Sequence, residues 1–563
     1  MDKSGVEKTE YSGSIVDLPN ESLSSTQSAS FEDHEAQKEA GGHTTKRALK
    51  SRHVQLIALG GCIGTGLFVG SGAMLSNSGP ASIFIAYIVM SFVIYVVMNA
   101  LGEMTTYLPL AGAAPPMYVN RFVDDSLAFA CGWNYWYAYA ILVASEVTAA
   151  SIVVEYWTDK VPVAVWITIF LVSIVILNII AVSVFGECEF WFASIKIIGI
   201  IGLIIVGIVI FFGGAPTHDR LGFRYWKHDA FKEYIVKGDS GRFCGFWNAL
   251  IRSGFSFILS PELVTISAGE TEAPRRNIPK ATKRFAYRLI AFYVLGSLVI
   301  GVIVSGNDPR LLGAVNSGGE DAAASPFVIG IQNAGIPVLN HIINAVILTS
   351  AWSAGNSFLY AGSRTMYSLA CHGEAPAIFK RCTPNGVPYL CVAATAAVGC
   401  LAFLNVSSGS SEAFTWLSNI STISGFLAWM CVLTAMIRFR KAIWFNHGTF
   451  DVLPFKTPFQ PWSTWFVLFL VGLMCITNGF TVFVGGSFTG ADFVASYITL
   501  PLFAAIYVGH RYIYKRAGFK TPFARPIAEV DITTGLKEAQ EVEDMFPERL
   551  PRNWIEKVWF WIA

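Results

Sequence analysis

The chain has 563 residues, of which 53 % are hydrophobic and 14 % are charged, and its mean hydropathy is +0.50. These values exclude an ordinary soluble globular enzyme and indicate a polytopic membrane protein. The formal net charge is only +1 with neutral histidines, which argues against nucleic acid as a partner.

Residues 1–50 are rich in Ser, Thr and Glu with scattered Lys, so we expect a disordered cytoplasmic tail. About twelve later segments are long enough, at roughly 20 residues each, to cross a bilayer core of about 30 Å. The sequence therefore predicts an all-α membrane protein whose core covers residues 51–516. The expected spans begin near His53, Ala81, Leu127, Pro162, Phe190, Gly245, Phe285, Pro337, Pro388, Ala413, Trp462 and Phe493.

Two of these spans are interrupted at matching points of the two halves of the chain. The interruptions lie in Leu59–Phe68 and in Ser256–Leu263. Glycine tolerates unwinding and proline removes a helical hydrogen bond, so each span is predicted to break and to leave peptide groups unpaired. Paired broken helices in two repeats indicate the substrate site of a transporter.

The repeats themselves are expected at about 53–214 and 245–440, with five spans each. Because five is odd, the second repeat would enter the membrane from the opposite side. Two extra helices at about 462–515 follow, and then a tail of residues 517–563. The aromatic residues that close this tail would form a helix that lies in the membrane interface or packs against the inner face of the bundle.

Basic residues flank the expected spans unevenly, and cytoplasmic loops are the ones that retain Lys and Arg. Four clusters fall on one side, which predicts that both termini are cytoplasmic. The loop 215–244 carries six basic residues on the predicted outer side and runs against this pattern. The four clusters are Lys46, Arg47, Lys50 and Arg52; Arg275, Arg276, Lys280, Lys283 and Arg284; Arg438, Arg440 and Lys441; and Arg511, Lys515 and Arg516.

The first interruption contains Gly64, Thr65 and Gly66. Their spacing resembles the GxGxxG motif of nucleotide-binding proteins. No strand or βαβ unit surrounds them, however, which excludes that interpretation. Close packing between helices is the alternative, although six glycines between Gly60 and Gly72 exceed what one packing face requires. The freed N–H groups at the start of the outer half-helix would hold a carboxylate, with help from the helix dipole.

Ionisable residues inside the spans are few, so each is a functional candidate. Glu262, beside Pro261 in the second interruption, can accept hydrogen bonds from freed amides or meet a substrate ammonium. Lys196 can bind and release a coupling proton or replace a sodium ion, because desolvation disfavours its charged form. The alternative, a lysine that reaches to the interface from the first turns of span five, stays open.

Three further charged residues have two interpretations each. Glu146 in span three and Glu103 near the inner end of span two are functional candidates, or they hydrogen-bond between helices. Glu103 can also anchor its helix at the interface. Arg252 lies a few turns before the second interruption and either pairs with a carboxylate or faces an outer vestibule.

Polar residues also recur along span eight, at spacings of three and four that place several on one helical face. They would line a wet pathway or hold helices together; the residues are Asn344, Ser350, Ser353, Asn356 and Ser357. The aromatic residues of Trp133–Tyr137 are expected to form an inner interfacial belt rather than a gate.

On these residues the chain resembles the fungal amino acid permeases of the amino acid–polyamine–organocation superfamily, over about 450 residues. The resemblance implies a twelve-helix, leucine-transporter-like fold with a 5+5 inverted repeat and broken helices one and six. It also implies proton-driven amino acid uptake at the plasma membrane. The motifs that carry it are Ile63–Gly70, Gly132–Trp136, Pro261–Val264, Ala268–Glu270, Pro274–Ala281 and Ala354–Ser357.

Within that family, Phe257–Val264 and Gly245–Ile251 look most like the proline permeases, although Ser260 departs from their pattern. The resemblance places the substrate backbone on Gly64, Thr65 and Gly66, with Phe257, Ser260 and Glu262 opposite and Lys196 beside the first break. Lys196, Glu146 and Glu262 are the candidates for proton coupling. Glu103, Arg252, Ser353 and Asn356 are secondary candidates.

We therefore expect a proton symporter that moves L-proline and other small neutral amino acids inward. The alternatives are a broad neutral amino acid or γ-aminobutyrate permease, an exchanger, and a non-transporting sensor, against which the short N-terminal tail counts. No catalytic constellation, cofactor or metal site is expected, since the ten cysteines form no CxxC pair. Membrane lipids are further partners, and Lys3, Lys8, Lys38 and Lys46 are accessible to ubiquitination and trafficking machinery.

Overall fold

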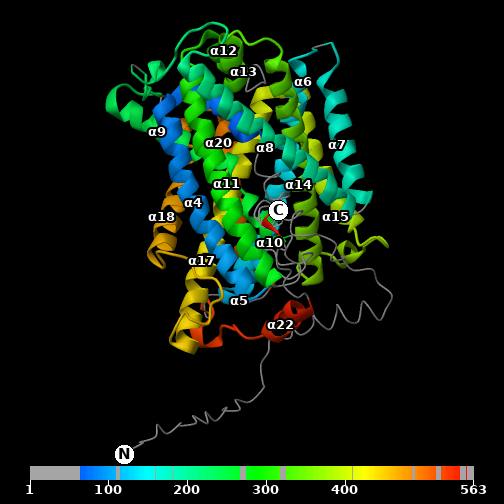
Figure 1. Ribbon diagram of the computed structural model, residues 1–563. Coiled ribbons are helices and arrows are strands. Elements are labelled where there is room, and N and C mark those ends of the chain that lie inside the picture. The colour runs from blue at the N-terminus through cyan, green and yellow to red at the C-terminus, as the bar shows by residue number, and fades with distance from the viewer. Residues whose placement is uncertain are drawn as a thin grey trace, which may run out of the picture.

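The protein is described by a computed structural model, in which the regular elements are all helices. They stand side by side as an upright bundle, with short helices across both ends (Figure 1). The predictions for residues 1–63, for Ala268–Glu270 and for the closing aromatic residues 555–563 lie outside the described residues. The described residues are 64–109, 115–158, 160–180, 182–227, 229–266, 274–316, 325–408, 410–484, 488–514, 522–545 and 553–554.

Seven helices within these ranges are long and apolar enough to cross a membrane. An eighth is added if α20 (Gly490–Tyr497) and α21 (Thr499–Val508), which meet at 47°, are one bent span. The chain is therefore an all-helical, multi-pass membrane protein with seven or eight candidate spans. The seven are α4 (Pro80–Tyr107), α6 (Asp125–Glu155), α7 (Val163–Ile180), α8 (Val182–Phe212), α11 (Pro274–Ile303), α14 (Leu339–Cys371) and α17 (Ser410–His447).

Shorter helices occupy the positions of the other expected spans. The sixth position is divided into three elements, which are described with the site below. These shorter elements are η1 (Gly66–Gly70) with α3 (Ser71–Ser78), α9 (Gly238–Ser253), η3 (Gly254–Ser256), α10 (Ser260–Ile266), α15 (Tyr389–Gly399) with η7 (Cys400–Leu404), and α18 (Trp462–Ile476).

Further short helices lie in the connections and in the C-terminal part of the chain. They are α5 (Pro115–Phe122), η2 (Arg224–Trp226), α12 (Pro309–Asn316), α13 (Pro326–Asn333), η6 (Ala377–Lys380), α16 (Asn405–Ser408), α19 (Phe480–Phe483), η8 (Gly509–Tyr514), η9 (Ile527–Glu529) and α22 (Leu536–Met545). Figure 1 shows α12 and α13 at one end of the bundle and α5 and α22 at the other. We call these the α12 end and the α22 end.

Three helices begin well before the starts that the sequence predicted. The fifth span was expected near Phe190, the sixth near Gly245 and the seventh near Phe285, whereas α8, α9 and α11 begin at Val182, Gly238 and Pro274. The expected starts follow the apolar stretch, but a helix continues through charged residues where these find partners. The prediction of these three starts was wrong for that reason. As a result, Glu189 of α8 was left outside its expected span.

Local sequence sets two of the helix boundaries clearly. The side chain of Asp124 accepts hydrogen bonds from the N–H groups of Ser126 and Leu127 at 3.0 and 3.1 Å, which caps the first turn of α6. Gly79 adopts a φ of +83°, and Pro80 follows it at the first position of α4. Glycine accepts this backbone angle without strain, and proline at the first position needs no N–H partner.

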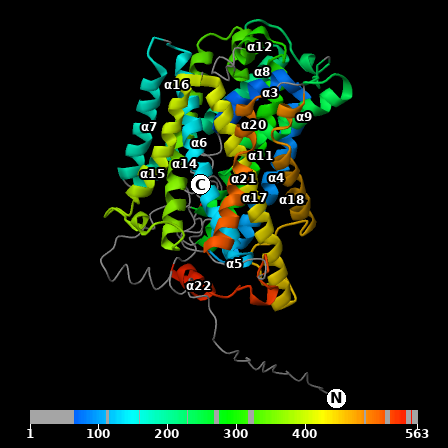
Figure 2. The ribbon, with the colours of Figure 1, turned by 180° about the vertical axis from the view of Figure 1, so that it is seen from behind.

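The core of the bundle lies around α6, whereas α7 and α8 form part of its outer face. In the apolar stretch of α6, 94 % of the residues are buried, against 22 % in α7. α6 contacts α14, α17, α5, α15, α7 and α21, and Figure 2 shows it in the middle of the bundle from the other side. On α7, exposed apolar side chains recur at helical spacing, at Val165, Ile169, Val172 and Ile176. Such a stripe is suited to lipid.

At the α22 end, a buried ion pair joins α4 to α17. The Arg440 guanidinium donates to both oxygens of Glu103 at 2.7 and 2.9 Å. Thr457 donates to the same carboxylate through its N–H at 2.9 Å and its hydroxyl at 2.6 Å. The Glu103 side chain is fully buried. Glu103 is therefore not an exposed interfacial anchor, and it holds α4 to α17.

The C-terminal segment, residues 522–545, packs against the α22 end of the bundle. Arg121 of α5 pairs with Asp531 at 2.7 Å, and its Nη2 also donates to the carbonyl oxygen of Thr534 at 2.6 Å. Arg525 pairs with Asp125 at the start of α6. Arg276 of α11 pairs with Glu543 on α22. This segment thus bonds to residues 121–125 and to Arg276, two parts of the chain that lie far apart in sequence.

The Glu103–Arg440 pair gives a stability prediction. In Arg440→Met the Glu103 carboxylate would stay buried without its cation, which we expect to cost about 3 kcal/mol of folding free energy. The melting temperature of the purified protein in detergent should fall clearly.

Lys456→Met is the matched control, because Lys456 and its partner Asp451 are largely exposed. Equal melting temperatures for the two variants would contradict the structural role assigned to Glu103.

Candidate substrate site

The second interruption breaks the sixth expected span into three pieces. α9 ends at Ser253, a short 3-10 turn runs through Gly254–Ser256, and α10 begins at Ser260. Between them, Leu259 has a φ of +57°, a left-handed conformation that side chains rarely adopt. Pro261 lies in the first turn of α10, where its missing N–H leaves no helical bond unmade. The chain therefore changes direction between Ser256 and Ser260, next to Pro261.

Hydroxyl groups satisfy the carbonyl groups of this break. Tyr293 of α11 donates to the Ser256 carbonyl at 2.8 Å, and Tyr139 of α6 donates to the Leu259 carbonyl at 3.1 Å. Ser260 Oγ donates to the Phe257 carbonyl at 2.5 Å. The hydroxyl of Ser260, a predicted substrate contact, is thus directed to the backbone of its own chain. Buried carbonyls need such partners, so the break depends on α6 and α11.

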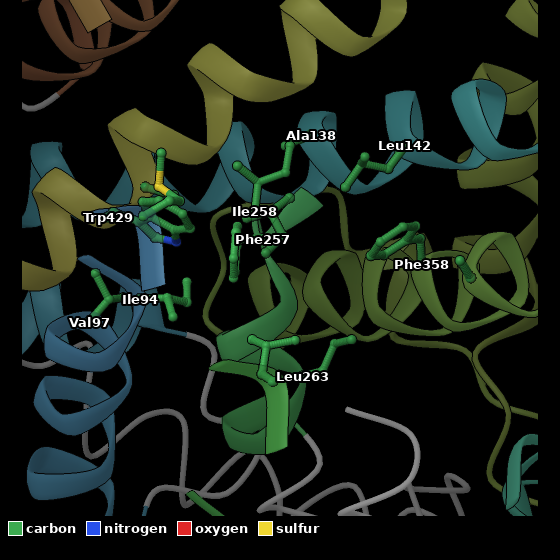
Figure 3. Close-up of a cluster of buried hydrophobic side chains, with 14 of the residues drawn as sticks. Ile94, Val97, Ala138, Leu142, Phe257, Ile258, Leu263, Phe358 and Trp429 are labelled. Carbon is green, nitrogen blue, oxygen red and sulfur yellow. The ribbon is translucent and has the colours of Figure 1, made fainter. Parts of the chain in front are cut away.

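Aromatic and aliphatic side chains enclose the break. Phe257 is fully buried, and its ring centroid lies 4.4 Å from that of Tyr293 and 5.9 Å from that of Tyr87. Tyr87 Oη also lies 3.0 Å from Ser256 Oγ. Figure 3 shows the surrounding cluster, in which labelled residues come from α4, α6, α14 and α17. The break therefore lies in the apolar centre of the bundle, where an apolar part of a ligand would be desolvated.

Glu262 lies just beyond the break and is fully buried. Its Oε1 accepts a hydrogen bond from Tyr135 of α6 at 3.1 Å. Within the described residues its Oε2 has no hydrogen-bond partner, and neither has Nε1 of Trp429, although Trp429 lies beside this carboxylate. Glu262 is thus only half satisfied, and one of its oxygens can take a proton or a further donor.

The prediction of an aromatic belt at Trp133–Tyr137 was wrong for Tyr135. Tyr135 is fully buried, and its hydroxyl reaches Glu262. Trp133 and Trp136 bond instead to the carbonyl of Glu374 at 3.2 Å and to Thr395 at 3.1 Å. On a helix, neighbouring residues face different directions, so one aromatic stretch serves several neighbours.

The first interruption is described from Gly64 onward, where η1 leads into α3. Gly66 lies directly against the second interruption: a Cβ added there would be 2.5 Å from Ser256 Oγ and 2.8 Å from Ser256 Cα. A Cβ on Gly64 would be 2.7 Å from Oε1 of Glu146. The two interruptions therefore meet, and a carboxylate from α6 lies beside the first.

Unpaired polar atoms collect at this meeting point. Thr65 is fully buried and lies beside Glu146. Thr65 Oγ1 and Glu146 Oε2 have no hydrogen-bond partner among the residues that the structure describes. Because unpaired buried polar atoms are costly, a polar ligand bound here would gain from pairing them.

Lys196 of α8 is fully buried, which rules out the interpretation in which it reaches to the interface. Its charge acts on two carboxylates, those of Glu146 and Glu189. Glu189 was not predicted from the sequence, because the expected start of this span, Phe190, comes one residue after it. The available signal was the spacing of seven between Glu189 and Lys196, which puts both on one face of a helix.

Ser353 and Asn356 of α14 bond to this second carboxylate. Ser353 Oγ donates to Glu189 Oε1 at 2.6 Å, and Asn356 Nδ2 donates to Glu189 Oε2 at 3.4 Å. Both side chains are fully buried. The polar face of span eight therefore forms a hydrogen-bonded contact with α8 at these two residues.

Comparison with known proteins identifies the family. Residues 53–520 match the amino acid permease family. The chain belongs to this family. The resemblance noted from the sequence is thereby confirmed, and the protein is a transporter rather than an enzyme.

Several curated relatives are similar over most of their length. The chain is 65 % identical to a probable proline-specific permease of Schizosaccharomyces pombe, over 89 % of this chain and 90 % of the relative. It is 56 % identical to the proline-specific permease of Emericella nidulans, over 92 % and 94 %. The proline-specific permease of Saccharomyces cerevisiae is 54 % identical, over 90 % and 82 %.

A solved structure supports the fold alone. The manganese transporter of Eremococcus coleocola superposes with a TM-score of 0.51 at 13 % sequence identity, over 83 % of this chain and 96 % of that one. The identity is too low to carry any argument about substrate. The superposition indicates that the helices of this permease are arranged as in a membrane transporter.

Arg252 lies in the last turn of α9, just before the second interruption. It lines a small cavity together with Gly66, Phe255, Ser418 and Thr422. Because Gly66 also touches Ser256, this cavity lies next to the meeting point of the interruptions. Of the secondary candidates, Arg252 is thus close to this meeting point, whereas Glu103 pairs with Arg440.

Two glycines of η1 give a matched test of the meeting point. In Gly66→Ala the new methyl group would collide with the backbone of Ser256, and we expect amino acid uptake to fall by about tenfold or more because the two interruptions are forced apart. Uptake of labelled amino acid should be measured at equal surface expression.

Gly70→Ala is the control, since a Cβ at Gly70 has nothing within 4 Å. If both variants transport alike, the contact between Gly66 and Ser256 has no part in the site.

Proposed function

We propose that this permease takes up L-proline, and other small neutral amino acids, in symport with protons across the plasma membrane. The observation that carries the proposal is the contact of the broken sixth span with Gly66, inside a chain 54–65 % identical to three permeases named proline-specific. Identity to the lysine-specific and dicarboxylic amino acid permeases of Saccharomyces cerevisiae is only 41 % and 40 %.

The substrate backbone would bind between the two interruptions. The N–H groups at Gly64, Thr65 and Gly66, at the start of a half-helix, suit a carboxylate. Phe257 offers an apolar wall for a pyrrolidine ring. Ser260 and Glu262 would act on the substrate indirectly, because the hydroxyl of Ser260 donates to the backbone and Glu262 accepts from Tyr135.

Proton coupling would use Lys196 with Glu146, and Glu262 is the further candidate. Lys196 is buried and acts on Glu146, which in turn lies against Gly64. A proton bound in this group of charges is therefore next to the place where the substrate would bind. Binding of proton and substrate together would favour closure of the outer half-helices, followed by rocking of one part of the bundle against the other.

The finer architecture belongs to the same proposal. Twelve spans would form two inverted repeats, at about 53–214 and 245–440, with helices one and six broken and two extra helices at 462–515. A disordered tail of residues 1–50 would precede them and a tail of residues 517–563 would follow. Helices at every expected position within the described residues support this arrangement.

Both termini would be cytoplasmic, with the α22 end facing the cytoplasm. Arg276, Arg438 and Arg511, each from a different basic cluster, donate there to carbonyl groups of the C-terminal segment. The loop 215–244 runs against this orientation. Some of its basic residues pair with acidic ones, Arg224 with Asp219 at 2.6 Å and Arg242 with Asp239 at 3.0 Å. The hydrogen bond from Arg224 holds the pKa of Asp219 below its ordinary value. Acidic residues count little in the rule that cytoplasmic loops retain Lys and Arg, so the loop still runs against this orientation.

Other partners follow from composition and are part of the proposal. Membrane lipids would surround the apolar faces of α7 and α8. Lysines of the N-terminal tail would be acceptors for ubiquitination and so for trafficking; they are Lys3, Lys8, Lys38 and Lys46.

Purified protein in liposomes tests the function directly. With an inward proton gradient we expect labelled L-proline to accumulate above its outside concentration, and a sodium gradient alone should not support accumulation. Unlabelled neutral amino acids and γ-aminobutyrate, added as competitors, would separate a proline-selective permease from a broad one. Uptake that appears only with substrate inside the liposome would indicate an exchanger. Binding without any transport would indicate a sensor.

The coupling role of Lys196 gives a second test. Lys196→Met should abolish accumulation driven by the proton gradient while leaving expression intact, because the buried ammonium is lost but a side chain of similar length remains. Lys441→Met is the control, since Lys441 is an exposed lysine. Unchanged concentrative uptake in Lys196→Met would remove this residue from the coupling role.

A further inference from the structure

Glu189 is a buried carboxylate that the proposed mechanism does not use. It lies on α8, and its side chain is fully buried. From α14 it accepts hydrogen bonds from Ser353 at 2.6 Å and Asn356 at 3.4 Å, and Ser357 lies on the same side. Hydrogen bonds to both oxygens of a carboxylate favour its ionised form.

The orientation of Asn356 is fixed by a third helix. Asn178 of α7 donates through Nδ2 to Asn356 Oδ1 at 2.9 Å and to the Asn356 carbonyl at 3.3 Å. With its oxygen held in this way, the amide of Asn356 presents N–H groups to Glu189. The site around Glu189 is therefore built as a set of donors from α14, which α7 keeps in place.

Within the described residues, the helices around Glu189 bring both charged and neutral side chains towards it. α8 itself contributes Lys196, whose charge acts on Glu189. α7 and α14 contribute the neutral side chains described above. α6 contributes Glu146, which interacts with the same Lys196. Glu187, the other carboxylate of this part of α8, is exposed.

One buried lysine is thus shared by two buried carboxylates in different surroundings. Glu189 has donors for both oxygens, whereas Oε2 of Glu146 has none in the part of the chain that the structure describes. One ammonium cannot neutralise two carboxylates, and an uncompensated buried charge is costly. The group is neutral only when one further proton is bound, and the less satisfied carboxylate is where that proton belongs.

We propose that Glu189 is a positioning residue for proton coupling: it stays ionised as the counter-ion of Lys196, so that the exchangeable proton resides on Glu146, beside the substrate site. This inference rests on the proton symport proposed above. Within the described residues the hydrogen bonds of Glu189 come from α14, and it acts on the site through Lys196. Its donors on α14 connect the charge group to a helix that packs against both α6 and α8.

The test compares Glu189→Gln with Glu187→Gln in liposomes. Two quantities are measured at equal protein: proline accumulation driven by a proton gradient, and proline exchange without a gradient. In Glu189→Gln we expect accumulation to fall by about tenfold more than exchange, because coupling is lost before substrate contacts are. Glu187→Gln, on the exposed side of the same helix, should match the wild type in both.

A stability cycle tests the ion pair without any transport. Lys196→Met should lower the melting temperature, because Glu189 is left buried and ionised without its cation, and adding Glu189→Gln should restore it in part. Glu189→Asp keeps the charge and should retain more accumulation than Glu189→Gln.

A milder variant covers the case in which Glu189→Gln does not fold. Ser353→Ala removes one donor but leaves the charge, and it should shift the pH dependence of uptake relative to the wild type. The inference is overturned if Glu189→Gln accumulates proline like Glu187→Gln, if accumulation and exchange fall equally, or if the double variant is no more stable than Lys196→Met. Wild-type protein that fails to accumulate proline on a proton gradient would instead refute the symport, and the stability cycle would still decide whether Glu189 and Lys196 form a pair.

Discussion

A peptide carbonyl in the middle of a membrane protein must find a donor inside the protein, because lipid offers none. This constraint governs the sixth span, where the helix stops at Ser256 and resumes at Ser260. Tyr139 and Tyr293 supply donors from α6 and α11, and Tyr87 of α4 reaches the same turn. A break of this kind can exist only where those three helices converge. The place of the break is therefore set by the surrounding bundle as much as by the residues of the break.

The same constraint explains how far the sequence could be interpreted. Pro261 and its neighbours predicted the position of the break, because a missing N–H is a local property. Its donors were not predictable, since Tyr139 is 120 residues from Leu259 and Tyr87 is 169 residues from Ser256. Helical periodicity tells which residues share a face but not which helix that face meets. Tyr135 was assigned to an interfacial belt for this reason, whereas Glu189 was left outside its span because the expected start followed the apolar stretch.

Buried carboxylates illustrate the difference between sequence and structure in another way. Glu103, Glu146, Glu189 and Glu262 are all buried, and only their hydrogen bonds show which of them have both oxygens paired. Glu103 and Glu189 have both oxygens tied to donors, whereas Glu146 and Glu262 each keep one oxygen unpaired among the described residues. Fully satisfied groups hold helices together, and partly satisfied ones are where protons or ligands can add to the structure.

The C-terminal segment has a consequence for the order in which the protein is made. Arg276 is translated 267 residues before its partner Glu543, and Arg121 and Asp125 are translated 410 and 400 residues before their partners Asp531 and Arg525. Until then these three side chains must remain hydrated or be held by other contacts. The later segment 522–545 therefore closes one end of a bundle whose helices have already entered the bilayer, and a nascent chain released before this segment would lack the closure.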